Sequence, residues 1–286
     1  MPLQIHRQIR PLRAQLHRAR EQGQRIALVA TMGNLHEGHL GLLRLAQEHA
    51  EQVVASIFVN PLQFGLNEDW DQYPRTFESD VEKLDAAGCH QLFCPPDAEM
   101  YPNGQAQQTR VICEGLTDIL CGASRPGHFA GVTTVVAKLL NIVAPEVAIF
   151  GEKDWQQLAL IRRMVADLCI PVKILGAPVA RAADGLALSS RNSFITPEER
   201  PRVRQLHDSL CWIKTQIEAG NRDFAALETA ARHQIEQADL RPDYIAIRAA
   251  SSLAPPSPAE RNLAILGALF TRAARLIDNV QVHLKD

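Results

Sequence analysis

The chain has 286 residues, 46% hydrophobic and 22% charged, a balance typical of a soluble globular protein with one large or two ordinary domains. Its formal net charge of −2 argues against a protein built mainly to coat nucleic acid, and no apolar run reaches the roughly 20 residues that span a bilayer. The cysteines lack the C-x-x-C spacing of zinc sites, and a chain of this length needs no disulfide framework, so we expect reduced thiols in a cytoplasmic protein.

The first half of the chain alternates helix-like and strand-like segments. Its Arg-rich start predicts an amphipathic helix over residues 9–23, and an organelle transit peptide is the alternative. Strands are predicted at 26–31, 53–59, 91–94, 147–151 and 171–176, with helices from about residue 38 and at 76–88, 132–143 and 154–168. This alternation predicts an α/β domain over residues 1–176, a Rossmann-like parallel sheet with helices on both faces.

The pattern changes after Gly176. The sequence TPEER (196–200) matches a capping box, with Thr196 as N-cap and Glu199 at N3, and predicts the start of a long helix. A second helix from about Asp223 and strand-like runs at 244–248 and 262–270 follow. Residues 177–286 are therefore predicted to form a smaller C-terminal α+β domain, which we expect to act as a lid.

The stretch TMGNLHEGHL joins the first long strand to its helix. A helix N-terminus after a parallel strand offers N–H groups and a positive dipole end to phosphate. Gly33 and Gly38 allow close backbone approach, and His36 and His39 share one face of the first turn, where they can donate to phosphate oxygens. The spacing H-x-G-H is the HIGH signature of nucleotidylyltransferases. The alternatives are that both histidines only cap the helix, or a zinc site, which the spacing disfavours.

Two further motifs suit phosphates. In FGEKDWQQL (150–158), a strand end is followed by Lys153, whose mobile cation matches a triphosphate, and by Asp154, which can cap a helix. In ADGLALSSRNSFI (183–195), an Asp-Gly turn precedes two hydroxyls, a guanidinium and an amide that can close on phosphates. Taken singly, these motifs can also be a solvated surface lysine and a polar linker loop.

Two stretches resemble a floor for a small polar substrate. Asn60 and Gln63 follow a strand and offer uncharged amides, which suit hydroxyls and a carboxylate. Arg125 and His128 precede a helix too apolar to be solvent-exposed. Ligands of parallel sheets bind at the carboxyl ends of the strands, where the first of these stretches and the HIGH-like and GEKD motifs are expected.

Seven stretches in order resemble the pantoate–β-alanine ligase family: TMGNLHEGH, SIFVNPLQF, DQYPRT, RPGHFAGV, GEKDWQQLALIR, ADGLALSSRN and RLIDN (275–279). The likeness covers essentially the whole chain. It implies ATP-dependent condensation of (R)-pantoate with β-alanine through a pantoyl-adenylate intermediate, with release of AMP and pyrophosphate. It also implies Mg2+ with the ATP, small-molecule partners rather than nucleic acid or a membrane, and a homodimer. It identifies no metal ligands.

The resemblance also implies roles for individual residues. His39 is expected to be the catalytic proton donor, His36 a phosphate partner, and Lys153 the cation that neutralises phosphate charge. Gln63 and Gln157 are expected to bind pantoate, with Asn60, Tyr73, Arg125 and His128 as secondary contacts. Residues expected at the nucleotide are Met32, Gly33, Asn34, Leu35, His36, Glu37, Gly38, His39, Gly151, Glu152, Lys153, Asp154, Ala180 (through its backbone, at adenine), Leu188 (packed against adenine), Ser189, Ser190 and Arg191.

The chain departs from the family pattern at three positions, and three other functions compete. Leu188 replaces a common methionine, Ala30 a common proline and Cys121 a common acidic residue, none of them catalytic.

A nucleotidylyltransferase acting on a phosphate acceptor would need a basic pocket, and a tRNA-binding synthetase fragment would need a basic surface. A regulatory nucleotide-binding protein without catalysis would not need His39, Lys153 and Ser190.

Overall fold

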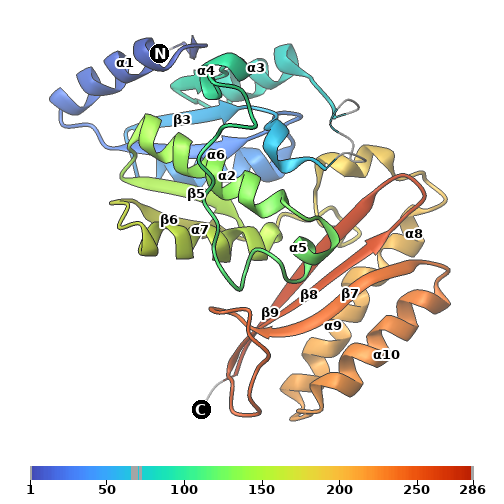
Figure 1. The fold of residues 1–286 in the computed structure, drawn as a ribbon. Coiled ribbons are helices and arrows are strands. Elements are labelled where there is room, and N and C mark those ends of the chain that lie inside the picture. The colour runs from blue at the N-terminus through green and yellow to red at the C-terminus, as the bar shows by residue number, and fades with distance from the viewer. Residues whose placement is uncertain (1, 66–69, 71–72, 285–286) are drawn as a thin grey trace. The chain divides into compact units, whose positions relative to one another are not determined.

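The computed structural model describes residues 2–65, 70 and 73–284 and divides into two compact units (Figure 1). The first unit comprises Met1–Glu152 and Leu160–Pro178, and the second comprises Lys153–Ala159 and Val179–Asp286. The domains expected at residues 1–176 and 177–286 were each assigned a function, and those two assignments stay predictions.

A six-stranded parallel sheet forms the centre of the first unit, with the strand order β1-β4-β3-β2-β5-β6. Its strands are β1 (Gln4–His6), β2 (Ile26–Thr31), β3 (Gln52–Ile57), β4 (Gln91–Phe93), β5 (Val147–Gly151) and β6 (Lys173–Ala177). The predicted parallel sheet is confirmed. The edge strand β1 was not predicted, because three residues are too few to show a period.

Helices cover both faces of this sheet (Figure 1). They are α1 (Ile9–Glu21), α2 (Glu37–Gln47), α3 (Phe77–Ala86), α4 (Asp97–Met100), α5 (Cys121–Ser124), α6 (His128–Val143) and α7 (Trp155–Asp167), with 3-10 turns η1 (Pro61–Gln63) and η2 (Glu152–Asp154). Leu43 of α2 and Leu84 of α3 pack with Val29, Val53 and Ile149 of the sheet in one core cluster. On the other face α1 contacts α6, which contacts β2, as right-handed crossovers require.

The second unit is an α+β structure, as predicted. Its antiparallel sheet contains β7 (Arg241–Ala249), β8 (Asn262–Phe270) and β9 (Arg275–His283) in that order. The 3-10 turn η3 (Ser190–Phe194) precedes α8 (Arg200–Val203), α9 (Gln205–Glu218) and α10 (Phe224–Gln237). Helix α9 packs on β8 and β9, and α10 on β7 and α9, around a core that includes Leu210, Ile213, Ile235 and Ile265.

The capping box at the start of the second unit's helices forms, but the helix begins later than predicted. Glu199 N donates to Thr196 Oγ1 (3.3 Å) and Thr196 N donates to Glu199 Oε2 (3.4 Å). Helix α8 nevertheless starts at Arg200. A helix capped at Thr196 would hold Pro201 in its interior, where proline removes a hydrogen bond and clashes with the preceding turn. Starting at Arg200 places Pro201 in the first turn, where it is tolerated.

Two sequence expectations concern the chain as a whole. All six cysteines lie among the described residues and are free thiols, as expected. Within the described part of the chain, no helix combines the length and apolar character that crossing a membrane requires.

Candidate active site

The predicted site residues are distributed over both units. In the first unit, a buried carboxylate holds the loop between β2 and α2. Asp80 of α3 accepts hydrogen bonds from Asn34 N (2.8 Å), Leu35 N (2.7 Å) and Thr76 Oγ1 (3.1 Å), and it is 1% exposed. Gly33 has φ +82°, and a Cβ there would lie 3.0 Å from Asp80 Oδ2. The glycine therefore serves the protein's own loop as well as any ligand.

Both histidines of the HIGH-like motif bond to the N-terminus of α2. His36, the N-cap, accepts from Gly38 N through Nδ1 (3.2 Å), and His36 N donates to His39 Nδ1 (3.3 Å). The ring centroids are 4.1 Å apart. A ring nitrogen that accepts a hydrogen bond carries no proton, so each neutral ring holds its proton on Nε2.

Both histidines do cap the helix, as the alternative interpretation of the motif expected. The two rings cap the helix through Nδ1 and keep Nε2–H as a donor, which is the group a phosphate oxygen needs. Among the neighbours, Leu35 is buried in the core, whereas the exposed Glu37 forms an ion pair with Arg44. Helix capping and phosphate binding are compatible functions of the same side chains.

A buried amide network lies beside this loop. Gln63 of η1 accepts from Asn60 Nδ2 (3.1 Å) and donates from Nε2 to the Met32 sulfur (3.0 Å), which links the network to the HIGH-like loop. Asn60, 1% exposed, also donates to Gly131 O (3.2 Å) and accepts from the Tyr101 hydroxyl (2.7 Å). Burial raises the pKa of Tyr101, so its hydroxyl stays a donor. The structure therefore brings together Met32, Asn60 and Gln63.

The second predicted pair fixes the backbone of the same network. Arg125 Nη1 lies 3.0 Å from His128 Nε2, and His128 Nδ1 lies 2.8 Å from Gln63 O. A guanidinium only donates, so Nε2 accepts and the Nδ1–H donates to Gln63 O. Tyr73 is buried with its ring edge-on to Phe64. Residues 71 and 72 of the DQYPRT stretch lie outside the described residues.

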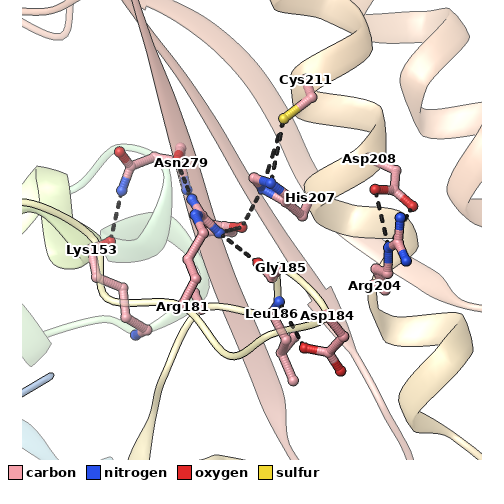
Figure 2. Close-up of polar contacts among 12 residues, drawn as sticks. Lys153, Arg181, Asp184, Gly185, Leu186, Arg204, His207, Asp208, Cys211 and Asn279 are labelled. Carbon is pink, nitrogen blue, oxygen red and sulfur yellow. Dashed lines mark hydrogen bonds and ion pairs between the residues drawn. The ribbon is translucent and has the colours of Figure 1, made fainter. Parts of the chain in front are cut away.

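In the second unit, the segment that carries Lys153 has two backbone anchors. Asn279 Nδ2 donates to Lys153 O (2.9 Å) (Figure 2). Trp155 Nε1 donates to Ala250 O (3.1 Å). The Lys153 ammonium lies 3.7 Å from Asp154 Oδ1, and the two side chains are 18% and 45% exposed. Four residues on, Gln157 is half-buried in α7.

The predicted phosphate clamp follows a tight hairpin formed by residues 180–188, hereafter the 180–188 hairpin. Leu188 N donates to Ala180 O (2.9 Å), and Ala182 N donates to Leu186 O (2.9 Å). After it, Ser189 Oγ accepts from Arg191 N (3.2 Å), and Ser190 begins η3. The hairpin thus brings together the two residues expected at adenine.

Of the four nucleotide candidates in the GEKD motif, Gly151 and Glu152 belong to the first unit. A Cβ on Gly151 would meet nothing within 4 Å, so the backbone there is open to a ligand. Glu152 follows in η2 and is half-buried.

Four residues that hold the site were missed by sequence reasoning: Asp80, Tyr101, Asp278 and Asn279. The first two are 45 and 41 residues away from the groups they bind, and no local pattern indicates such contacts. The last two lie in the RLIDN stretch, which pointed to the family without indicating a role.

The geometry of both units suits charge stabilisation. The first unit offers imidazole donors at a helix N-terminus beside buried amides, and the second offers a lysine and a hydroxyl-rich turn. Each set of groups can stabilise charge that develops on a phosphate, without a covalent enzyme intermediate.

Comparisons with known proteins agree with this chemistry. The sequence model of the Pantoate-beta-alanine ligase family matches residues 4–281. A pantothenate synthetase of Cellvibrio japonicus is 57% identical over 282 residues, covering 99% of this chain and 100% of the relative, and one of Saccharophagus degradans is 55% identical with 99% of each covered.

Two solved structures are similar in fold as well. A Thermus thermophilus pantothenate synthetase has 43% identity and a TM-score of 0.91, covering 98% of this chain and 100% of its own. A Francisella tularensis pantoate–β-alanine ligase in complex with β-γ ATP and β-alanine has 33% identity and a TM-score of 0.78, with 97% of each chain covered.

Proposed function

The chain belongs to the pantoate–β-alanine ligase family, and from that premise we propose that it condenses (R)-pantoate with β-alanine to pantothenate at the expense of ATP. The observation that carries the proposal is the direct hydrogen bond from Gln63 to Met32. It joins an amide floor suited to a hydroxy acid to a loop suited to phosphates. A nucleotidylyltransferase acting on a phosphate acceptor would need cations where Asn60 and Gln63 lie.

The first step forms the adenylate. A pantoate carboxylate oxygen attacks the α-phosphorus of ATP, and the bond from that phosphorus to the bridging oxygen breaks, so that pyrophosphate leaves with the bonding electrons. His39, the proton donor of the family pattern, donates a hydrogen bond from its Nε2–H to the phosphate oxygen on which charge develops, His36 binds a phosphate oxygen, and Lys153 neutralises phosphate charge. Each such donor typically contributes about 10²–10³ in rate.

The second step forms the amide. The amine of β-alanine attacks the pantoyl carbonyl carbon, the carbon–oxygen bond to AMP breaks, and the nitrogen loses a proton. Gln63 and Gln157 hold pantoate, and Gln63 also lies near the β-alanine site. Positioning dominates because the acyl-adenylate is already activated.

The remaining roles follow the family pattern. We assign Arg125 to the support of Gln63, as its geometry with His128 indicates. Nucleotide contacts are assigned to Met32–His39, Gly151–Asp154, the backbone of Ala180, and Leu188–Arg191.

We propose that Mg2+ enters the site together with ATP. Among residues 2–65, 70 and 73–284, no group of three or more His, Cys, Asp or Glu could hold a metal ion. Mg2+ usually keeps several waters and binds through substrate phosphates, so a protein cage is not required. When bound, Mg2+ adds positive charge at the phosphates.

We further propose a homodimer in the cytoplasm that binds small molecules only. Residues 1–176 bind nucleotide and pantoate, and residues 177–286 form the smaller lid domain. A lid would protect an acyl-adenylate from water.

One assay tests the reaction. ATP–pyrophosphate exchange that requires pantoate but not β-alanine is expected, and AMP release should then require both acids. Exchange with a different carboxylic acid, and none with pantoate, would refute the substrate assignment while leaving the fold unaffected.

A further inference from the structure

Asp278 and Asn279, neighbours in the RLIDN stretch, lie in β9 and bind two different parts of the second unit. Side chains alternate between the faces of a strand, so the two residues point in opposite directions. Asp278 lies on the face of Leu276 and Val282, which pack in the helix-covered core. Asn279 therefore faces the other side of the sheet. The pair is placed to hold two separate segments at once.

The Asp278 carboxylate is buried and fully hydrogen-bonded. Its side chain is 4% exposed, and it accepts from Arg181 Nη1 (2.7 Å) and Nη2 (3.0 Å) and from Asn279 N (2.7 Å). His207 Nδ1 of α9 lies 3.2 Å from the same carboxylate. A buried charge with two cationic partners fixes those partners in direction as well as in distance.

Arg181 passes this constraint to the 180–188 hairpin. Besides Asp278, its guanidinium donates to Gly185 O (3.1 Å) in the hairpin turn and to Asn279 O (3.2 Å) in β9 (Figure 2). Gly185 has φ +89°, and a Cβ there would lie 3.3 Å from the His207 ring. The hairpin that carries Ala180 and Leu188 is thereby held at its turn by Arg181 and packed on His207.

Asn279 holds the other segment. Its Nδ2 donates to Lys153 O (2.9 Å), the backbone of the residue assigned to the phosphates (Figure 2). Because the contact is to the backbone, it fixes the point from which the side chain extends and does not engage the ammonium.

We propose that Asp278 and Asn279 are positioning residues for adenylate formation: Asn279 places Lys153, and Asp278 places the adenine-binding hairpin through Arg181. The proposal deepens the proposed function and rests on it. Because the two residues are adjacent in one rigid strand, the phosphate cation and the adenine site are held in a fixed relation. A misplacement of about 1 Å at such a site can cost about 10²-fold in rate.

The two positioning roles, of Asn279 and of Asp278 through Arg181, predict different kinetic effects in pantoate-dependent pyrophosphate exchange. Asn279→Leu removes the bond to Lys153 and should lower kcat about 30- to 100-fold, with the KM for ATP within about threefold of wild type. Arg181→Lys keeps the charge beside Asp278 but cannot bind it and Gly185 together, because an ammonium lacks the planar fork. It should raise the KM for ATP about tenfold with a smaller change in kcat. Asp278→Asn would leave two cations without a counter-charge, so Arg181→Lys is the safer variant for folding.

A second ion pair of β9 provides the matched control. Arg275 donates to Asp243 Oδ2 from Nε (2.9 Å) and Nη2 (2.7 Å), with side chains 15% and 16% exposed. This pair contacts neither Lys153 nor the hairpin. Asp243→Asn should leave both kinetic constants near wild type, although it removes a comparable ion pair. If all three variants change kcat and KM alike, the pairs are only structural and the proposal is wrong.

Amide hydrogen exchange tests the same idea without catalysis. In Arg181→Lys, the amides of residues 180–188 should exchange at least about tenfold faster, and in Asn279→Leu those of residues 153–157 should. Asp243→Asn should change neither. Unchanged exchange in the first two variants overturns the positioning role even where the enzyme is active. If the wild type shows no pantoate-dependent pyrophosphate exchange, the proposed function is refuted. Amide hydrogen exchange would still show whether Asp278 and Asn279 position the two segments.

Discussion

At the scale of single residues, each of the two imidazoles caps a helix through one ring nitrogen and, in the proposed function, binds phosphate through the other. Nδ1 of His36 and of His39 accepts a backbone N–H at the start of α2. The protonated Nε2 is then the group offered to a ligand. The H-x-G-H spacing predicted a phosphate site, whereas the assignment of the ring proton to Nε2 follows from the hydrogen bonds to Nδ1 in the structure.

Replacing His39 separates these two functions. In His39→Asn, the amide oxygen can accept the His36 N–H in place of Nδ1, but nothing replaces Nε2–H. We expect kcat for adenylate formation to fall about 10²–10³-fold, with thermal stability close to wild type. His39→Ala should show the same fall in kcat as His39→Asn. Its free energy of unfolding should be lower by about 1 kcal/mol more, because the helix cap is broken. Pyrophosphate exchange and urea unfolding of both variants measure this. An Asn variant with a tenth or more of wild-type activity would show that Nε2 is not the proton donor.

Asp80 tests whether the loop must be held for ATP to bind. Asp80→Asn leaves one oxygen where two accept backbone N–H groups, and it turns an amide NH2 toward a donor. We expect a loss of about 2 kcal/mol in the free energy of unfolding and a higher KM for ATP. Asp85→Asn is the matched control in the same helix, because Asp85 is exposed and accepts from Leu3 N (2.9 Å) at the surface. Equal ATP KM values in the two variants would contradict the role of Asp80.

At the scale of secondary-structure elements, apolar runs determined what could be predicted. Strands β2, β3 and β5 are continuous apolar segments and were predicted to within two residues. Strand β9 was not predicted, because Asp278 and Asn279 interrupt its pattern with buried polar side chains that serve the site. Contacts such as Asp80 with the loop between β2 and α2 connect distant segments and leave no local pattern. Sequence therefore located the motif residues, while their supports required the structure.

Close packing of α6 on η1 gives a prediction at this scale. A Cβ on Gly131 would lie 2.3 Å from Leu62 O and 2.7 Å from Gln63 N. Gly131→Ala must therefore push the two elements apart and disturb the Asn60–Gln63 network. We expect the KM for pantoate to rise at least about tenfold, and unfolding to be easier by about 1–3 kcal/mol.

Gly41→Ala is the control for this change. Gly41 lies in α2, where an added Cβ would find its nearest atom at 3.9 Å. Alanine there should stabilise the helix by about 0.5–1 kcal/mol without a kinetic effect. If Gly131→Ala keeps the wild-type KM for pantoate, the contact between α6 and η1 does not position Gln63.

At the scale of the whole molecule, pH should act on the stability of the second unit through one cluster. The hydrogen bonds with Asp278 and then Cys211 raise the pKa of His207 from 6.5 to about 9, against burial and the nearby Arg181. For Asp278, burial opposes ionisation, but the hydrogen bonds from His207 and Arg181 outweigh it and hold its pKa below the usual value. At neutral pH the cluster is therefore ionised and paired.

The sign of the pH effect follows from the raised pKa. Charged His207 contributes its full stabilisation below pH 6.5, and this contribution is lost as pH rises through about 9. The shift corresponds to about 3 kcal/mol, at about 1.4 kcal/mol per pH unit. Urea unfolding across this window should show wild type losing stability relative to His207→Gln, which does not titrate there. Parallel pH profiles for the two proteins would exclude His207 as the source.

The discontinuity of the second unit has a consequence for how the protein is made. Lys153–Ala159 belongs to that unit, yet the side chain that anchors Lys153 is Asn279, 126 residues later. At about 5–20 residues per second, a ribosome delivers that partner roughly 6–25 s after Lys153 itself. The backbone of Lys153 therefore receives this anchor only after 126 further residues have been synthesised. If adenylate formation depends on this contact, no nascent chain that ends before Asn279 should form the adenylate.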